Sequence, residues 1–343
     1  MNNPQPFPKI NITFAPAWWH HNYGIDFSQT LWSDVVRSTE SACERSRLLY
    51  ERFGDVGLGE ADPQPRPQAA YTYGDRFMAA FWGCKIRYLP DQPPAAIALE
   101  DPLKHMETIK VPSIEDSPVV EKAFADAARL KEAFGKVQSG INFGAPLNNA
   151  VSVYGEEILA ACVGEPELAT WVLRQMAEAI MVVYDRVSSV IDETPGDPRQ
   201  AFFSLGNCPV CMIRPKTYSQ VVLPVDLWMR EQFKGRFMLH HCGIFHPYVE
   251  VYKPLKPTEL DLGWGTDLRA ARAAFPDLPM STYIDVSALR GITREGVDAI
   301  VSKIVHDAGP RELLTSIAVA EIGPDVPDET VRDLITSGER ITI

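Results

Sequence analysis

This chain of 343 residues lacks several features that define common classes of protein. Residues 1–14 contain no positive segment followed by an apolar one, so we expect no signal peptide. We also expect no membrane span, because no apolar run reaches the roughly 18 residues that a spanning helix needs. The net charge of −12, without a basic stripe, argues against nucleic acid as a partner. The acidic balance suits a cytoplasmic enzyme.

Two catalytic motifs and a structural metal motif are also missing. No GxGxxG follows the early strand-like runs, which weakens a dinucleotide-binding interpretation, and no GxSxG occurs. The CxxC pattern occurs once, at Cys208 and Cys211, so it cannot form a zinc knuckle of four cysteines alone. The chain has six cysteines, which should stay reduced in a cytoplasmic protein. Buried thiols or metal ligands are therefore favoured over disulfides.

From about residue 138, strand-like apolar runs alternate with helical patterns. The predicted strands are 139–144, 201–205, 236–241, 259–263, 280–284 and 313–319, and the predicted helices are 166–193, 215–234, 266–275, 293–308 and 327–337. This alternation predicts a parallel sheet with crossover helices, and its length favours a (β/α)8 barrel (TIM barrel) over a doubly wound open sheet. We expect one domain over 1–343.

The first hundred residues are predicted to be an irregular N-terminal extension of that domain. Within it, residues 33–53 form a helix that Ser33 or Asp34 can cap and Gly54 ends. Prolines predict loops at 61–67 and 90–94.

In a barrel, the chemistry lies at the carboxyl ends of the strands. The predicted strand ends carry a set of polar, aromatic and metal-binding residues: Asn142, Asn207, Cys208, His240, His241, Cys242, Trp264, Asp285 and Glu321. His240 and Cys242 are two residues apart on one strand, so both can face one zinc ion while His241 points away. The alternative is a hydrogen-bonded histidine beside a buried thiol.

Several other residues are candidates with an equally plausible structural role. Cys208 can face the barrel mouth, whereas Cys211 is expected to pack. Asn207, His241 and Asp285 are candidate catalytic groups, although Asp285 can equally cap the next helix. A further set of side chains is a candidate lid or wall of a substrate pocket, or else a hydrophobic plug: Trp18, Trp19, His20, His21 and Tyr23, with Asn142 and Trp264 at strand ends.

Three segments resemble the uroporphyrinogen decarboxylase superfamily. They are YGIDFSQTLW with the following LLYERFGDVGLG, then GAPLNNAVSVYGEEILAACVGEPELATWVLRQM, then MIRPKTYSQVVLPVDLWM with the later HHCG. The resemblance implies a (β/α)8 barrel with a deep central cleft. Its decarboxylases carry an arginine-rich N-terminal signature, where this chain has FAPAWWHHNYG.

The resemblance is therefore to the branch of zinc-dependent methyltransferases that work with a corrinoid protein. The H-x-C-G of that branch corresponds to His240, Cys242 and Gly243. The branch adds a cysteine near the last strand, but no cysteine follows Cys242 here. Glu321 is the first candidate for the third zinc ligand and Cys208 the second.

The resulting hypothesis is a zinc-dependent transfer of a methyl group between a small methylated substrate and a corrinoid protein. The cobalamin would be carried by that partner, because this chain shows no D-x-H-x-x-G. The aromatic N-terminal segment suggests a methoxylated aromatic substrate, and a homodimer is compatible with the sequence. The alternatives are a metal-free decarboxylase of a small carboxylic acid and a barrel that serves only for binding.

Overall fold

The computed structural model describes residues 7–69, 71–138, 143–192, 197–200 and 202–340. These residues form an α/β structure with one parallel sheet of six strands in the order β1-β8-β7-β6-β5-β4. The strands are β1 (Ile10–Phe14), β4 (Phe203–Gly206), β5 (Phe237–His241), β6 (Glu259–Leu262), β7 (Met280–Tyr283) and β8 (Leu314–Ile322). The predicted parallel sheet is confirmed from β4 to β8, whereas predicted strand residues 139–142 lie outside the described part of the chain.

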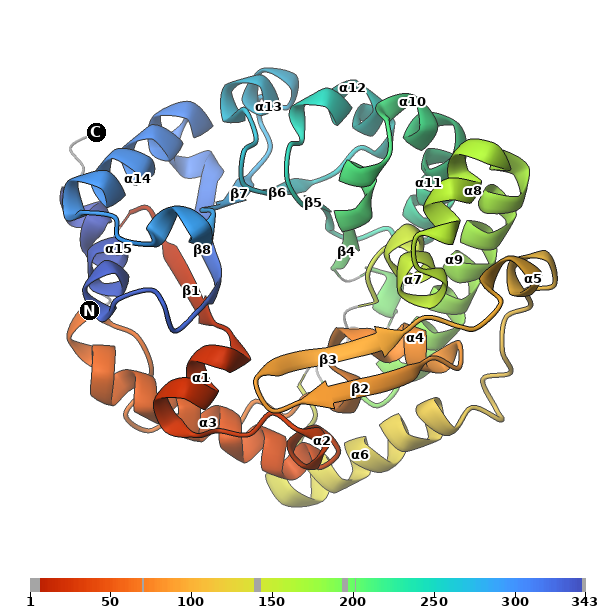
Figure 1. The fold of residues 1–343 in the computed structure, drawn as a ribbon, viewed down its shortest axis with the longest axis horizontal. Helices are drawn as coiled ribbons and strands as arrows, with labels where there is room; N and C mark the ends of the chain where they lie inside the picture. The colour runs from red at the N-terminus through yellow and green to blue at the C-terminus, as the bar shows by residue number, and fades with distance from the viewer. Residues whose placement is uncertain (1–6, 70, 139–142, 193–196, 201, 341–343) are drawn as a thin grey trace.

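The sheet curves around the centre of the molecule with helices outside it (Figure 1). The second half supplies α9 (Pro166–Ser188), α10 (Pro215–Thr217), α11 (Leu223–Gln232), α12 (Val249–Tyr252), α13 (Leu268–Ala274), α14 (Arg294–Ala308) and α15 (Asp328–Arg340). The longer helices confirm the predicted helical segments. Among the described residues the sheet has two edges, β1 and β4, so a closed barrel is not established.

The first hundred residues are regular, which corrects the prediction of an irregular extension. They contain β1, α1 (Pro16–Tyr23), α2 (Gln29–Trp32), α3 (Val35–Phe53) and α4 (Phe77–Phe81). They also contain the antiparallel hairpin of β2 (Lys85–Leu89) and β3 (Gln92–Ile97). The prolines at 93 and 94, taken as a loop signal, lie in β3. A two-stranded sheet has only edge strands, where proline is tolerated.

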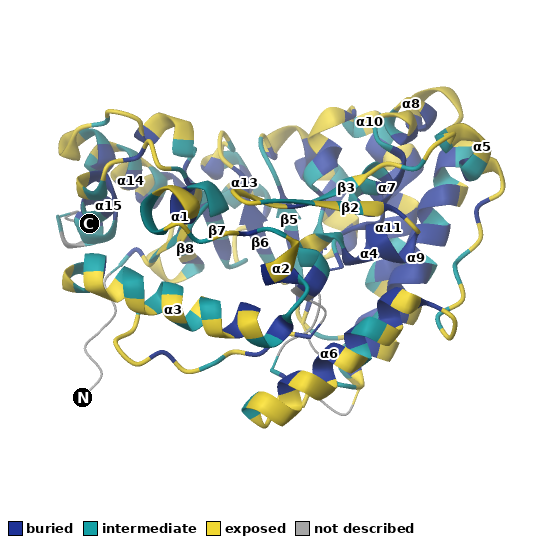
Figure 2. Ribbon diagram, turned by 60° about the horizontal axis from the view of Figure 1, so that its bottom comes forward, coloured by how far each residue is buried: buried dark blue, intermediate teal, exposed yellow. Residues whose placement is uncertain are grey.

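The remaining helices join the first strands to the second half. They are α5 (Pro102–Glu107), α6 (Pro118–Phe134), α7 (Pro146–Tyr154) and α8 (Glu157–Gly164). Figure 2 shows one exposed side on α3 and α6, whereas much of α9 is buried. This pattern places α9 in the core, where it packs against α7, α8 and α11, with α3 and α6 at the surface.

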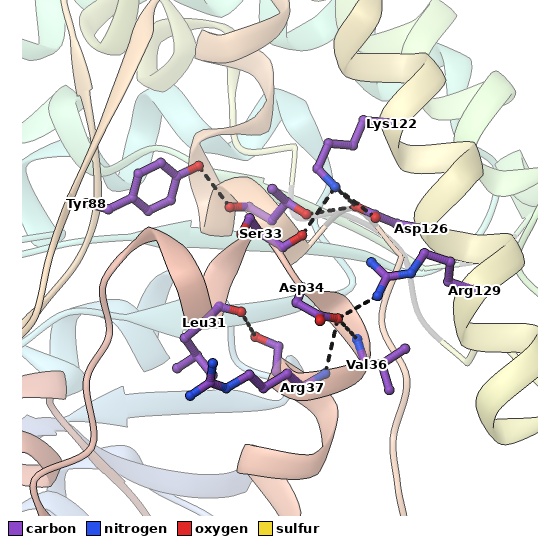
Figure 3. Close-up of polar contacts among 11 residues, drawn as sticks. Leu31, Ser33, Asp34, Val36, Arg37, Tyr88, Lys122, Asp126 and Arg129 are labelled. Atoms are coloured by element: carbon purple, nitrogen blue, oxygen red, sulfur yellow. Dashed lines mark hydrogen bonds and ion pairs between the residues drawn. The ribbon is translucent and has the colours of Figure 1, made fainter.

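The start of α3 is tied to α6 by polar contacts (Figure 3). Asp34 caps α3, as predicted, because its Oδ1 accepts from the backbone N–H groups of Val36 and Arg37 at 3.2 and 3.4 Å. The same oxygen pairs with Arg129 of α6 at 2.8 Å. Asp34 therefore both begins a helix and joins two of them.

Candidate metal centre

The sheet register brings the ends of β4, β5 and β6 together. Gly206 of β4 lies beside His240 of β5, and His240 lies beside Asp261 of β6. Cys208 starts the turn after β4, two residues beyond Gly206. Because parallel strands end at one edge of the sheet, a cysteine after β4 lies close to a histidine at the end of β5.

Cys208, His240 and Cys242 form a compact group. Their ligand atoms, two sulfurs and one imidazole nitrogen, all lie within 4.8 Å of one another. Cys242 Sγ lies 3.0 Å from His240 Nε2 and 3.0 Å from Cys208 Sγ. His240 and Cys242 thus face each other, in agreement with the alternation expected along a strand.

Asp261 of β6 orients His240 from the side opposite the sulfurs. Its Oδ2 lies 2.7 Å from His240 Nδ1 and accepts a bond from the Tyr283 hydroxyl at 3.1 Å. Its Oδ1 accepts a short hydrogen bond from Ser281. A carboxylate on Nδ1 fixes the ring and leaves Nε2 to act toward the two cysteines.

The sequence interpretation did not identify Asp261. The signal was present, because Asp261 is a charged residue between the apolar Leu260 and Leu262, and the structure buries all three. A charged residue inside a buried strand needs a partner, and that need points to a functional contact.

The pKa values within the group favour a negative charge on one member and a positive charge on another. The hydrogen bond from Cys242, assisted by His240, outweighs burial and lowers the pKa of Cys208 to about 4. Burial lowers the pKa of His240, but Asp261 and Cys208 outweigh it and raise that pKa to about 9. The bond to Cys208 and burial raise the pKa of Cys242 well above its ordinary value. The structure therefore favours a Cys208 thiolate beside an imidazolium.

The other two predicted residues around this turn are buried behind the group. His241 points away from the cysteines, and its Nδ1 lies 2.9 Å from the Tyr252 hydroxyl. Burial lowers the pKa of His241 to about 4, so the ring is neutral. Asn207 donates from Nδ2 to Asp226 at 2.8 Å. Both side chains support the site from behind and do not line it.

The structure does not place Glu321 in the metal group. Among the described residues that group consists of Cys208, His240 and Cys242, and the Glu321 side chain is exposed.

Asp285 caps the short helix after β7 by accepting from Ser287 N–H at 2.9 Å, the capping role foreseen for it. Asp285 and Trp264 line a cavity of about 650 Å³ beside α13 and α14. Asn142 lies outside the described residues.

The aromatic N-terminal segment forms α1 and packs inward. Trp18 is 1% exposed, and its ring lies 4.2 Å from Phe14 and 5.7 Å from Tyr23. Trp19 lines a cavity of about 650 Å³ between β1, α1 and α3. His20 and His21, in contrast, are exposed. Trp18 therefore serves the core of the N-terminal part.

A smaller cavity reaches the metal group itself. It has a volume of about 290 Å³ and is lined by Cys208 together with Arg76, Asn148 and Ser152. The Arg76 guanidinium lies 3.1 Å from the carboxylate of Asp75 at the same cavity. The space beside Cys208 is therefore small, and both polar and apolar residues line it.

Comparison with known proteins supports the fold. The chain matches no family model and no curated protein sequence. A solved structure of a methyltransferase from Methanosarcina mazei is similar, with a TM-score of 0.63 and 13% sequence identity. The match covers 99% of this chain and 95% of that one. At this identity the likeness establishes a shared fold. No helix of the described residues is long and apolar enough to cross a membrane.

Proposed function

We propose that this protein is a zinc-dependent methyltransferase that moves a methyl group between a small methylated substrate and a corrinoid protein. The observation that carries the proposal is the group of Cys208, His240 and Cys242 at adjacent strand ends. The likeness to a methyltransferase structure over almost the whole chain supports it. In this proposal the curved parallel sheet belongs to a (β/α)8 barrel of the uroporphyrinogen decarboxylase superfamily.

The chemistry of the three side chains fits zinc. Thiolate and imidazole are the ligands that zinc prefers, and three protein ligands are typical of catalytic sites that keep an open position. The carboxylate behind His240 is the partner expected of a metal-binding histidine. Cys208, which follows β4, would supply the third ligand, which in the methyltransferase branch is a cysteine near the last strand. When bound, zinc would act as a Lewis acid on the heteroatom that gains or loses the methyl group.

The residues of the chain prepare this site before any substrate arrives. Hydrogen bonds from Cys242 and His240 keep Cys208 in its thiolate form, which is the form that binds a metal. Asp261 prevents the His240 ring from turning away from the sulfurs. The cavity beside Cys208 would position the substrate against the metal. Its volume of about 290 Å³ favours a small substrate.

The test is zinc content in three forms of the protein. We expect about one zinc per chain in wild type and in Cys211→Ser, and none in Cys208→Ser. Cys211 is a matched control because it lies in the same turn, is exposed, and bonds only the backbone oxygen of Cys208 at 3.1 Å among the described contacts. Methyl transfer with free methylcobalamin or reduced cobalamin should follow zinc content.

Wild-type protein that takes up no zinc on titration would overturn the proposal. The Cys208 thiolate, the His240 imidazolium and the Asp261 carboxylate would then remain as a metal-free array of the kind that activates a nucleophile. Release of carbon dioxide from a small carboxylic acid would instead favour the decarboxylase alternative.

A further inference from the structure

Behind the metal group, three buried polar atoms lack a hydrogen-bond partner among the described residues. They are Asn207 Oδ1, Asp226 Oδ1 and His241 Nε2. Such atoms are rare in proteins, and each one calls for an explanation. Two of them belong to side chains that are already joined, because Asn207 Nδ2 donates to Asp226 Oδ2 at 2.8 Å.

Asp226 is fully buried, and no positively charged side chain among the described residues contacts it. Its side chain is 0% exposed, and its Oδ2 accepts from the Tyr218 hydroxyl as well as from Asn207, each at 2.8 Å. Burial raises the pKa of Asp226 to about 7 despite these two donors, and no cation contributes to that shift. A buried carboxylate without a cation is costly, whereas the protonated acid is not.

Three titratable side chains around Asp226 are neutral near pH 7. Burial raises the pKa of Tyr218, on the preceding π-helix (Tyr218–Val222), well above its ordinary value. Burial does the same to Tyr252 of α12, and it lowers the pKa of His241 of β5. None of these three side chains offers a positive charge to an ionised Asp226.

We propose that Asp226 is a neutral carboxylic acid that pairs with the carboxamide of Asn207 through two hydrogen bonds, and so fixes the turn that carries Cys208. In this pair the amide donates to Oδ2, and a proton on Oδ1 is donated to Asn207 Oδ1. Both unpartnered oxygens are then satisfied at once. The role of Asp226 toward the metal rests on the proposed function, whereas the pairing itself does not.

The pair acts on Cys208 through the backbone. The N–H of Asn207 donates to the carbonyl oxygen of His240 at 2.9 Å, so the backbone of Asn207 is held to β5 and its side chain to α11. Cys208 is the next residue, and its sulfur must meet His240 and Cys242. Asp226 is therefore a positioning residue, and it touches neither the metal nor the substrate in this scheme.

The test compares two substitutions of nearly equal size. Asp226→Asn reproduces the neutral acid, since its amide oxygen accepts from Asn207 and Tyr218 while its NH2 donates to Asn207 Oδ1. Asp226→Leu removes every one of these bonds. We expect cobalt(II), used as a spectroscopic probe for zinc, to bind Asp226→Asn within about threefold of wild type with the same thiolate-to-cobalt absorption. Asp226→Leu should bind at least about tenfold more weakly.

A second measurement needs neither metal nor activity. Infrared difference spectra of wild type minus Asp226→Asn should contain the carbonyl band of a protonated carboxyl group at about pH 5.5, where an ordinary aspartate is ionised. If the band is missing and Asp226→Asn binds cobalt about tenfold more weakly, Asp226 is ionised and the proposal is wrong. If the band is present but Asp226→Leu binds cobalt as tightly as wild type, Asp226 does not position Cys208.

These readouts also separate the two proposals. If wild type binds no cobalt, the zinc-site proposal fails, and the infrared band still decides whether the acid–amide pair exists. Should Asp226→Leu fail to fold, Asp226→Asn and the infrared band still give a decision. The alkylation rate of Cys208 in metal-free protein, followed by mass spectrometry, then shows whether the turn that carries Cys208 keeps its position. Equal rates in wild type and Asp226→Asn support the acid–amide pair. A faster rate in Asp226→Asn contradicts it.

Discussion

Asp261 illustrates how one side chain can set the properties of a site that it does not enter. It holds His240 at Nδ1 and is itself held by Ser281 and Tyr283 of the next strand. The His240 contact and these hydrogen bonds lower the pKa of Asp261 in spite of its burial, so it remains a carboxylate. The basicity and orientation of His240 therefore depend on an ionised Asp261.

We predict that Asp261→Asn weakens zinc binding by about 10- to 100-fold, because a carboxamide gives His240 neither the charge nor the same tautomer preference. Competition with a chromophoric chelator measures this affinity. Tyr283→Phe is the control, because it removes a single hydrogen bond to the same carboxylate and should cost much less. Equal affinities of wild type and Asp261→Asn would show that the carboxylate has no influence on the metal.

Asp226 gives a pH-dependent prediction at the same scale. Its pKa is about 7 in the folded protein, against about 3.9 for an unfolded aspartate. Between these values the folded chain keeps a proton that the unfolded chain has lost, so wild-type stability falls as the pH rises and levels off above 7. Asp226→Asn cannot titrate at this position. Its unfolding free energy relative to wild type should rise by roughly 2 kcal/mol from about pH 5.5 to about pH 7.5.

Urea denaturation at the two pH values measures this difference. The titration of the metal site affects both proteins and cancels in the comparison. A difference between the two proteins that stays constant with pH would show that Asp226 does not change protonation over this range.

The choice of metal ligands shows where sequence reasoning reaches its limit. His240 and Cys242 could be paired from the sequence because their spacing along one strand is a local property. The identity of the third metal ligand depends on which strands are neighbours in the sheet. β5 lies between β4 and β6, whereas β8 is separated from β5 by two strands. Cys208 after β4 therefore joins the group, and Glu321 on β8 does not.

Among the elements, the close packing of β5 against β6 constrains the backbone of the metal group. A Cβ atom at Gly263, just beyond β6, would lie 2.1 Å from the backbone nitrogen of Gly243 and 2.7 Å from the carbonyl carbon of Cys242. Gly263 N–H also donates to the His241 oxygen at 2.7 Å. Backbone atoms cannot give way as a flexible side chain can, so only glycine fits here.

We therefore predict that Gly263→Ala shifts the backbone of Cys242 and reduces zinc content to well below about half of the wild-type value, with a loss of about 2–4 kcal/mol in stability. Gly206→Ala is the matched control at the end of β4, because its Cβ would meet only the Cα of Gly144 at 4.0 Å. Zinc analysis and urea denaturation of both variants measure the effect. Similar behaviour of the two variants would show that the contact is not limiting.

The element scale is also where the sequence was most informative. β4 to β8 and the helices between them follow from alternating apolar runs, because each strand is buried and each helix has one apolar side. The hairpin of β2 and β3 was missed because Pro93 and Pro94 were taken to exclude a strand. That rule holds for central strands and fails at an edge.

At the scale of the whole molecule, the fold places the beginning of the chain beside its end. β1 pairs with β8, so Ile10 lies opposite Ile317. β1 is only five residues long, and its partner strand lies at the other end of the sequence. The residues near β1 therefore did not indicate a strand, and β1 was not predicted. The similar structure shares this fold at 13% identity, so different sequences can satisfy the same arrangement.

The two ends are also joined by side chains. Arg52 of α3 donates from Nε and Nη2 to the two carboxylate oxygens of Asp328 at the start of α15, at 2.6 and 2.7 Å. Its guanidinium lies 4.9 Å from the centre of the Trp18 ring of α1. The two side chains of the ion pair are only 28% and 33% exposed, so solvent weakens this pair less than it would a surface pair.

We predict that Arg52→Ala lowers the unfolding free energy by about 2 kcal/mol, because it removes a bidentate pair together with the packing on Trp18. Arg52→Lys should lose roughly half of that, since lysine keeps the charge without the two-pronged geometry. Arg66 provides the control: it pairs with Glu60 at 3.4 Å with 79% and 52% of the two side chains exposed, and Arg66→Ala should change stability by less than about 0.5 kcal/mol. Urea denaturation measures all three variants, and an Arg52→Ala protein as stable as Arg66→Ala would mean that the Arg52–Asp328 pair contributes little to holding the ends of the chain together.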